Sequence, residues 1–91
     1  VLRESCFEFN FDNFKYFYLK NSEITRIEEF AFHEFKYLIE LDLSINNLSF
    51  INSNVFNDLK SLNYLNISFN YLEIIDKNLI LSLLNLIILD F

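Results

Sequence analysis

Few side chains in this sequence are suited to catalysis or metal binding. His33 is the only histidine and Cys6 the only cysteine, whereas a zinc site needs several ligands of these types. The chain contains no glycine, so it lacks the glycine-rich loops that hold phosphates and the glycine-flanked turn that presents a nucleophilic serine. We therefore expect no catalytic site, no cofactor and no metal. We interpret His33 as a solvated surface residue. For Cys6 we favour a buried core thiol, because a buried cysteine usually behaves as a small hydrophobic residue. The second interpretation is a remnant of a cap, and the third is a reactive thiol.

The composition indicates one small folded domain with an acidic surface. Of its 91 residues, 53% are hydrophobic and 22% charged, which is too apolar for a disordered tail. The net charge of −6 disfavours binding to nucleic-acid phosphates. The longest apolar stretch, 79–91, is shorter than the roughly 20 residues that a membrane span needs, and polar residues interrupt it. We therefore expect no nucleic-acid partner and no membrane span in this segment.

The absence of glycine also constrains the turns. Backbone positions with positive φ are expected to fall to asparagine or aspartate, which tolerate that region better than other residues. Asparagine does stand between the apolar runs, as at Asn46, Asn47, Asn52 and Asn54.

The element that must position any binding residues is a repeat of 24 residues. Residues 38–48 and residues 62–72 both have the pattern L-x-x-L-x-[LI]-S-x-N-x-L. The second half of each unit repeats at three apolar positions: Ile27, Ile51 and Ile75; Phe32, Phe56 and Ile80; Phe35, Leu59 and Leu83. The spacing predicts repeats at 14–37, 38–61 and 62–85, with 1–13 as a partial preceding repeat or N-terminal cap remnant and 86–91 as the truncated start of a fourth.

This repeat resembles the leucine-rich-repeat family. Its 24-residue form is similar to the typical class of extracellular receptors, such as the Toll-like receptors, and of small leucine-rich proteoglycans. The resemblance implies an α/β-type repeat solenoid: an arc with one short parallel strand per repeat on the concave face and loops, turns or short helices on the convex face. The alternation of Leu41, Asp42 and Leu43 is itself strand-like, with the leucines pointing inward.

The resemblance also implies structural roles for polar and aromatic positions. Asn46 and Asn70 follow the predicted strands, where the family's asparagine bonds to the backbone of adjacent turns and forms a ladder. An unpaired buried amide costs about 1–3 kcal/mol, so those bonds are required. Ser22 holds the same position in the first repeat and offers fewer bonds, which predicts a weaker first rung. Phe32 and Phe56 are expected to stack as a spine beneath the convex side.

The outward side chains of the predicted strands form the candidate binding surface. Stacking aligns them in three columns: Tyr16, Glu40, Tyr64 and Ile88; Tyr18, Asp42, Asn66 and Asp90; and Lys20, Ser44 and Ser68. Tyrosine is enriched at protein interfaces, and acidic side chains beside it favour a basic or polar partner. The competing interpretation is that the acidic residues only keep the strand face soluble.

Two N-x-S sequons, at Asn47 and Asn66, are N-glycosylation sites if the protein is secreted. A sugar on Asn66 would stand on the strand face and obstruct it, whereas one on Asn47, at the strand exit, would obstruct it less. Chance is the competing explanation, because a chain rich in asparagine and serine produces such triplets without selection.

These patterns predict a protein-binding segment of a cell-surface receptor or secreted protein, which recognises a protein ligand or co-receptor without catalysis. The extracellular location rests on the resemblance. The alternative is a cytoplasmic leucine-rich-repeat scaffold or regulatory protein, which suits a chain with one cysteine; an enzyme would need a catalytic domain elsewhere. Because the truncated fourth repeat would lack a covering unit, self-association through uncapped ends is also expected.

Overall fold

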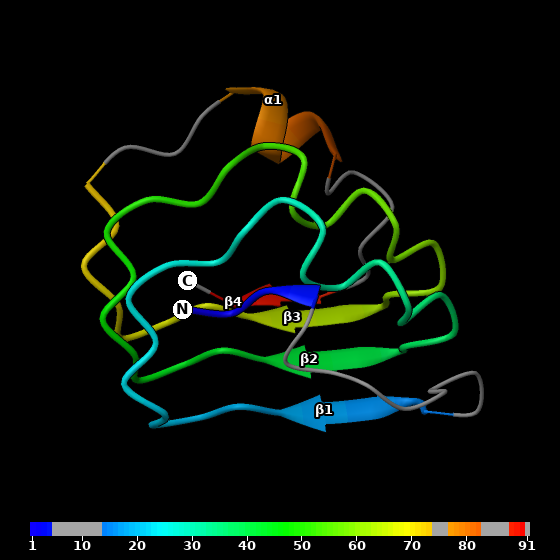
Figure 1. Ribbon diagram of the computed structural model, residues 1–91, viewed down its shortest axis with the longest axis horizontal. Helices are drawn as coiled ribbons and strands as arrows, with labels where there is room; N and C mark the ends of the chain where they lie inside the picture. The colour runs from blue at the N-terminus through cyan, green and yellow to red at the C-terminus, as the bar shows by residue number, and fades with distance from the viewer. Residues whose placement is uncertain (5–13, 74–76, 83–87, 91) are drawn as a thin grey trace.

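The computed structural model describes residues 1–4, 14–73, 77–82 and 88–90 of the chain. In chain order its elements are β1 (Tyr16–Tyr18), β2 (Glu40–Asp42), β3 (Tyr64–Asn66), α1 (Lys77–Ser82) and β4 (Ile88–Asp90). The strands lie side by side in one sheet in the order β1-β2-β3-β4, and turns and α1 lie on the side away from the sheet (Figure 1). Strands that follow one another in the chain are therefore neighbours in the sheet.

All three strand pairs are parallel and keep one register. Tyr16 pairs with Glu40 and Glu40 with Tyr64, and the same offset leads from Tyr64 to Ile88. Each step equals 24 residues, so the repeat of the sequence is also the repeat of the structure. A parallel pair requires a connection of at least about a dozen residues, because the chain must cross back before it pairs again. The parallel sheet fits the predicted repeat fold.

Each strand is three residues long, and in β1, β2 and β3 the central side chain points toward the core. Leu41 and Leu65 are fully buried, and Phe17 is half-buried. The side chains on either side of these point outward, as a pleat of period two requires. Backbone pairing continues past the strand end, where the amide of Leu43 donates to the carbonyl of Asn66 at 2.8 Å.

The side away from the sheet consists of tight turns over buried aromatic rings. Backbone amides there bond to carbonyls three residues back, as the amide of Ala31 does at 3.1 Å. Phe32 and Phe35 are completely buried. The ring of Phe32 stacks on that of Phe56 in the next repeat, with centroids 6.2 Å apart and an interplanar angle of 16°. The first two repeats therefore share an aromatic contact in their common core.

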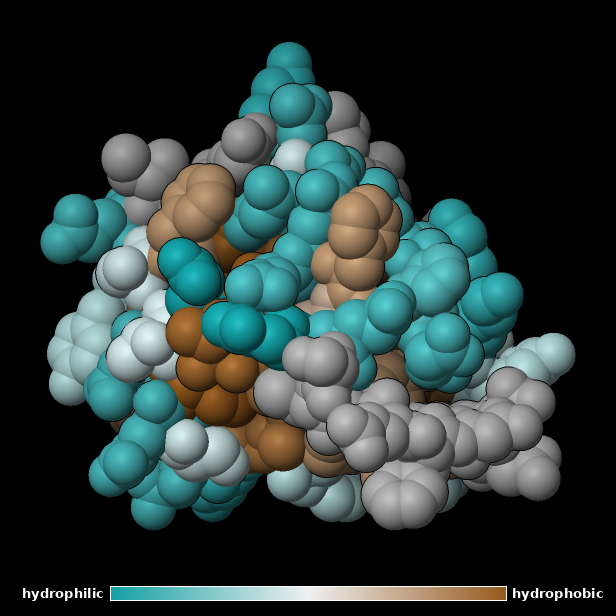
Figure 2. All heavy atoms as spheres, viewed as in Figure 1, coloured by the Kyte–Doolittle hydropathy of each residue, from teal (hydrophilic) through white to brown (hydrophobic). Residues whose placement is uncertain are grey.

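The N-terminal residues cover part of this core. Leu2 forms an isolated parallel β-bridge with Ile27, in which the amide of Leu2 donates to the carbonyl of Arg26 at 2.8 Å. Leu2 is almost fully buried. The guanidinium of Arg3 lies 3.5 Å from the Glu28 carboxylate. On the face of the molecule that carries this segment, hydrophilic side chains prevail and apolar atoms are visible between them (Figure 2).

Several residues named above lie outside the described part of the chain: Cys6, Ile75, Leu83 and 86–87, together with the side chains of Ile80, Ile88 and Asp90. The repeat boundaries stay predictions. Within the described residues, no helix has the length and the apolar character needed to cross a membrane.

Candidate interaction surface

The outward side chains of β1, β2 and β3 form a continuous surface, here called the strand face: Tyr16, Tyr18, Glu40, Asp42, Tyr64 and Asn66. The sheet register places them in two columns, one running from Tyr16 to Tyr64 and the other from Tyr18 to Asn66. The rings of Tyr16 and Tyr18 are 51% and 59% exposed, and the other four side chains are half-buried. Ile88 and Asp90 hold the corresponding register positions on β4.

The two columns are joined by a short hydrogen bond. The hydroxyl of Tyr18 donates to a carboxylate oxygen of Glu40 at 2.7 Å across the β1–β2 pair. That hydrogen bond, with smaller contributions from desolvation and from the nearby charges, raises the pKa of Tyr18 above its ordinary value of 10.0. The carboxylate favours the neutral, donating phenol because a phenolate would place two negative charges together. The bond fixes the orientation of one exposed ring on the strand face.

Replacing Glu40 by glutamine is expected to lower the pKa of Tyr18 toward 10.0. Because the folded-state pKa is raised, the bond's contribution to stability is fully present below the unfolded pKa and is lost as pH rises through the folded pKa. The measurement is an NMR titration from pH 8 to 12 that follows the chemical shift of the Tyr18 ring carbon that carries the hydroxyl. Glu34→Gln, on an exposed carboxylate away from the strands, should leave the curve unchanged, and an unchanged curve in Glu40→Gln would contradict the assignment.

Asp42 and Asn66 also end their strands. An Asp42 carboxylate oxygen accepts from the amide of Ser44 at 2.9 Å, and the Asn66 amide oxygen accepts from the amide and the hydroxyl of Ser68 at 3.0 and 2.6 Å. These local bonds turn the chain inward, so Ser44 and Ser68 are buried. The expectation of an outward third column is therefore wrong, and only Lys20 of that set is exposed.

Asn46 connects the turns of the first two repeats. Its buried amide oxygen accepts from the backbone amides of Ser22 at 3.0 Å and Ile24 at 2.9 Å. Its amide nitrogen donates to the carbonyls of Leu19 at 3.0 Å and Leu43 at 2.9 Å. One side chain thus satisfies backbone groups from two consecutive turns, which would otherwise be unpaired where water is scarce.

Asn70 repeats this arrangement one turn later with fewer bonds. Its amide oxygen accepts from the amide of Leu48 at 3.0 Å, and its nitrogen donates to the carbonyl of Leu43 at 3.0 Å. Ser22 holds the same position in the first repeat, but its hydroxyl bonds only to the carbonyl of Lys20 in its own turn, at 3.4 Å. Among the described residues, the inter-turn bonding of this position thus comes from the asparagines.

The two sequons differ in accessibility. Asn47 and Ser49 are both exposed. Asn66 is half-buried, and the serine of its sequon, Ser68, is buried and bonded to the amide oxygen of Asn66. Of the two sites, Asn47 is the better presented to a modifying enzyme.

A second feature lies where the chain leaves the strands, on the left in Figure 1. A surface cavity of about 500 Å³, here called the strand-exit cavity, is lined chiefly by Asn21, Glu23, Ile45, Asn47, Phe69 and Tyr71. Phe69 is 79% exposed, the highest value among the large hydrophobic residues that the structure describes. We did not predict this cavity from the sequence. A signal for it was present, because Ile45 and Phe69 occupy the same variable position of consecutive repeats.

The cavity walls are built from unusual backbone. Asn21, Ile45 and Phe69 have φ values of 55°, 54° and 55°, and Glu23 has 58°. The expectation that positive φ falls to asparagine and aspartate is therefore correct at Asn21 and wrong at the other three. For a side chain with a Cβ, this region costs about 1–2 kcal/mol per residue. The side-chain hydrogen bonds of Asn46 fix the turns that contain Glu23 and Ile45, and those of Asn70 fix the turn that contains Phe69. The side chains of Ile45 and Phe69 are exposed to solvent.

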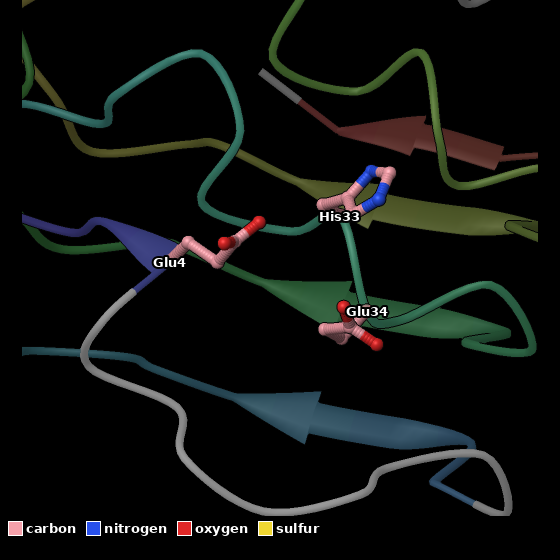
Figure 3. Close-up of side chains that lie close together, drawn as sticks. All are labelled: Glu4, His33 and Glu34. Atoms are coloured by element: carbon pink, nitrogen blue, oxygen red, sulfur yellow. The ribbon is translucent and has the colours of Figure 1, made fainter.

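His33, which we interpret from the sequence as a solvated surface residue, has a side chain that is 45% exposed and that also contacts neighbouring residues. It is half-buried: its Nδ1 lies 3.2 Å from an Asp58 carboxylate oxygen, and its ring meets that of Phe30 edge-on at 6.5 Å. Glu4 and Glu34 lie near it, with potential ligand atoms of the three groups within 4.8 Å of one another. Figure 3 shows the three side chains, which come from the N-terminal segment and from the turn that carries His33. Glu4 and Glu34 are exposed, and exposed acidic groups commonly lie together without an ion, so we assign no metal to them.

The sheet, the inter-turn asparagines and the outward strand face together define a repeat protein with one parallel strand per turn. Residues 12–72 match the family model of the leucine-rich repeat, and since this stretch exceeds half of the chain, the protein belongs to that family. Comparisons with curated proteins and with solved structures gave no match. Domains of this family generally mediate protein–protein interactions and are typically non-catalytic.

Proposed function

We propose that this chain is a protein-recognition segment of a cell-surface receptor or secreted protein, and that its strand face contacts a protein ligand or co-receptor. The observation that carries the proposal is the pair of exposed tyrosines, Tyr16 and Tyr18, in register with the carboxylates of Glu40 and Asp42. Tyrosine supplies a large amphipathic contact area at a small entropic cost. The carboxylates favour a basic partner. No catalytic step is assigned to this segment.

The proposal includes the 24-residue typical class, with the strand face on the concave side of an arc. What supports it is the constant offset of 24 residues between paired strands. In such a stack each repeat adds one row of side chains to the surface, so a ligand that spans several rows accumulates contacts.

Removing the tyrosines of the strand face is expected to weaken binding by at least about tenfold. Basic peptides displayed on phage are selected on the immobilised chain, and their dissociation constants are then measured for the triple variant Tyr16→Ala, Tyr18→Ala and Tyr64→Ala. The expectation follows because truncation of a central interfacial tyrosine typically costs about 1 kcal/mol or more, and about 1.4 kcal/mol corresponds to a factor of ten.

The matched control is the double variant Tyr37→Ala and Phe50→Ala. These rings are 57% and 58% exposed, as open as Tyr16 and Tyr18, but lie outside β1, β2 and β3. Both variants should keep the circular dichroism of the parent chain. Equal losses of affinity in the two variants, or no loss in the triple variant, would remove the strand face from the proposal.

The extracellular location is a proposal supported by the resemblance and by the accessible sequon at Asn47. If it is right, protein secreted from animal cells should lose mass on deglycosylation, and Asn47→Gln should abolish most of that loss while Asn66→Gln changes it little. The alternative, a cytoplasmic scaffold or regulatory protein, predicts no mass change in either variant.

Self-association of the chain is a separate prediction, which sedimentation velocity over a range of concentrations tests.

A further inference from the structure

The strand-exit cavity combines three kinds of surface that one type of side chain would use together. Phe69 and Tyr71 offer exposed aromatic rings, Ile45 an aliphatic wall, and Glu23 a carboxylate. Among the described residues no cation forms an ion pair with Glu23. The cavity therefore combines apolar walls with a negative charge that no ion pair within the described part of the chain neutralises.

The walls of the cavity are held in place before any ligand arrives. The amide of Ile45 donates to the carbonyl of Ser68 at 3.0 Å, and the amide of Tyr71 donates to the carbonyl of Leu48 at 2.8 Å. Asn47 is fixed in the same way by a bond of 2.9 Å to the neighbouring turn. A cavity with a fixed backbone loses little conformational entropy on binding, which favours recognition of even a single side chain.

The conformation of Ile45 and Phe69 also points to a binding role. Both residues adopt positive φ, which asparagine would adopt with less strain, and the Phe69 ring is largely exposed. Burial within the described fold thus offsets little of the unfavourable backbone energy at Phe69. Strained positions that the surrounding structure enforces are concentrated at ligand contacts, where the strain presents a side chain to the partner.

We propose that the strand-exit cavity binds an arginine side chain of a partner protein. The guanidinium lies over the ring of Phe69 or Tyr71 and pairs with the Glu23 carboxylate, while its methylene stem packs against Ile45. Arginine fits better than lysine, because its planar, weakly hydrated group stacks on aromatic rings and pairs with a carboxylate through two donors. This site is separate from the strand face, so either surface can fail its test without the other.

The test is an NMR titration of the ¹⁵N-labelled chain, made in bacteria so that Asn47 carries no sugar, with N-acetyl-arginine amide. We expect the amide signals of Glu23, Ile45, Phe69 and Tyr71 to shift together. The isosteric but neutral N-acetyl-citrulline amide should bind at least about threefold more weakly, because it keeps the stem and loses the charge. Raising the salt concentration should weaken the arginine probe and leave the citrulline probe unchanged.

Two substitutions separate the contribution of the aromatic ring to arginine binding from that of the carboxylate. Phe69→Asn should weaken the arginine probe about threefold to fivefold while the midpoint of urea unfolding stays constant or rises, since asparagine tolerates the backbone conformation and little burial is lost. Glu23→Gln should weaken it about threefold. Glu34→Gln, an exposed carboxylate far along the repeat, is the matched control and should have no effect.

Three results would overturn the proposal. The first is equal binding of the arginine and citrulline probes, which would indicate an apolar site. The second is a shift of signals on the strand face in place of the cavity. The third is tighter binding of free arginine than of the blocked amide, which would indicate an amino-acid site instead of a contact for a protein side chain.

Discussion

Replacing Asn46 by alanine is expected to lower the free energy of unfolding by about 3 kcal/mol. The substitution leaves the amides of Ser22 and Ile24 without their acceptor and the carbonyls of Leu19 and Leu43 without their donor. Each buried group left unpaired costs about 1–3 kcal/mol, and access of water to the part-buried positions offsets some of the sum. Urea unfolding followed by circular dichroism measures the change. The slope of the unfolding free energy against urea concentration should be the same in the parent chain and the variant.

Two further asparagine substitutions serve as comparisons for Asn46→Ala. Asn47→Ala removes an exposed side chain of the same type from the same turn, and should change the unfolding free energy by less than about 0.5 kcal/mol. Asn70→Ala should cost less than Asn46→Ala, because Asn70 is only half-buried and its amide oxygen accepts a single bond. A loss at Asn46 no larger than at Asn47 would show that the inter-turn bonds contribute little to stability.

The repeat fold could be predicted from the sequence because the same side chains recur at fixed intervals. Leu41 and Leu65 alternate with polar residues, so their inward direction follows from the pleat, and the offset between them sets the register of the sheet. The columns of the strand face follow from that register. The family to which the chain belongs was also recognisable from the pattern, since the matched residues 12–72 contain both full copies of it.

The parts that could not be predicted depend on local backbone geometry. Alternation suggested that Ser44 and Ser68 point outward, but the strands end two residues earlier, at Asp42 and Asn66, whose side chains accept hydrogen bonds from the serine amides. Side chains alternate between the two faces only within a strand, and a strand of three residues is too short for the alternation to predict the direction of the residues that follow it. The strand-exit cavity was missed for a related reason, because propensity alone does not place a β-branched residue such as Ile45 at positive φ.

Truncating Phe32 to alanine is expected to cost about 3–5 kcal/mol, the usual range for a buried phenylalanine. The ring is completely buried, stacks on Phe56, and meets Phe35 edge-on at 6.0 Å. Removing it leaves a cavity between repeats, which the tight turns of this side are poorly able to fill. Urea unfolding measures the loss. Phe32→Leu, which keeps most of the volume, should cost less and remain folded, and Phe50→Ala, on an exposed ring, should cost less than about 1 kcal/mol.

A double-mutant cycle with Phe32→Leu and Phe56→Leu then isolates the contact between repeats. We expect a coupling free energy of about 0.5–1.5 kcal/mol, the range for aromatic pairs in this geometry. In a stack whose units contact only their neighbours, stability is the sum of the units and of the interfaces between them. A coupling near zero would mean that the stacked rings contribute only their burial, and that the inter-turn bonds of Asn46 hold the first two repeats together instead.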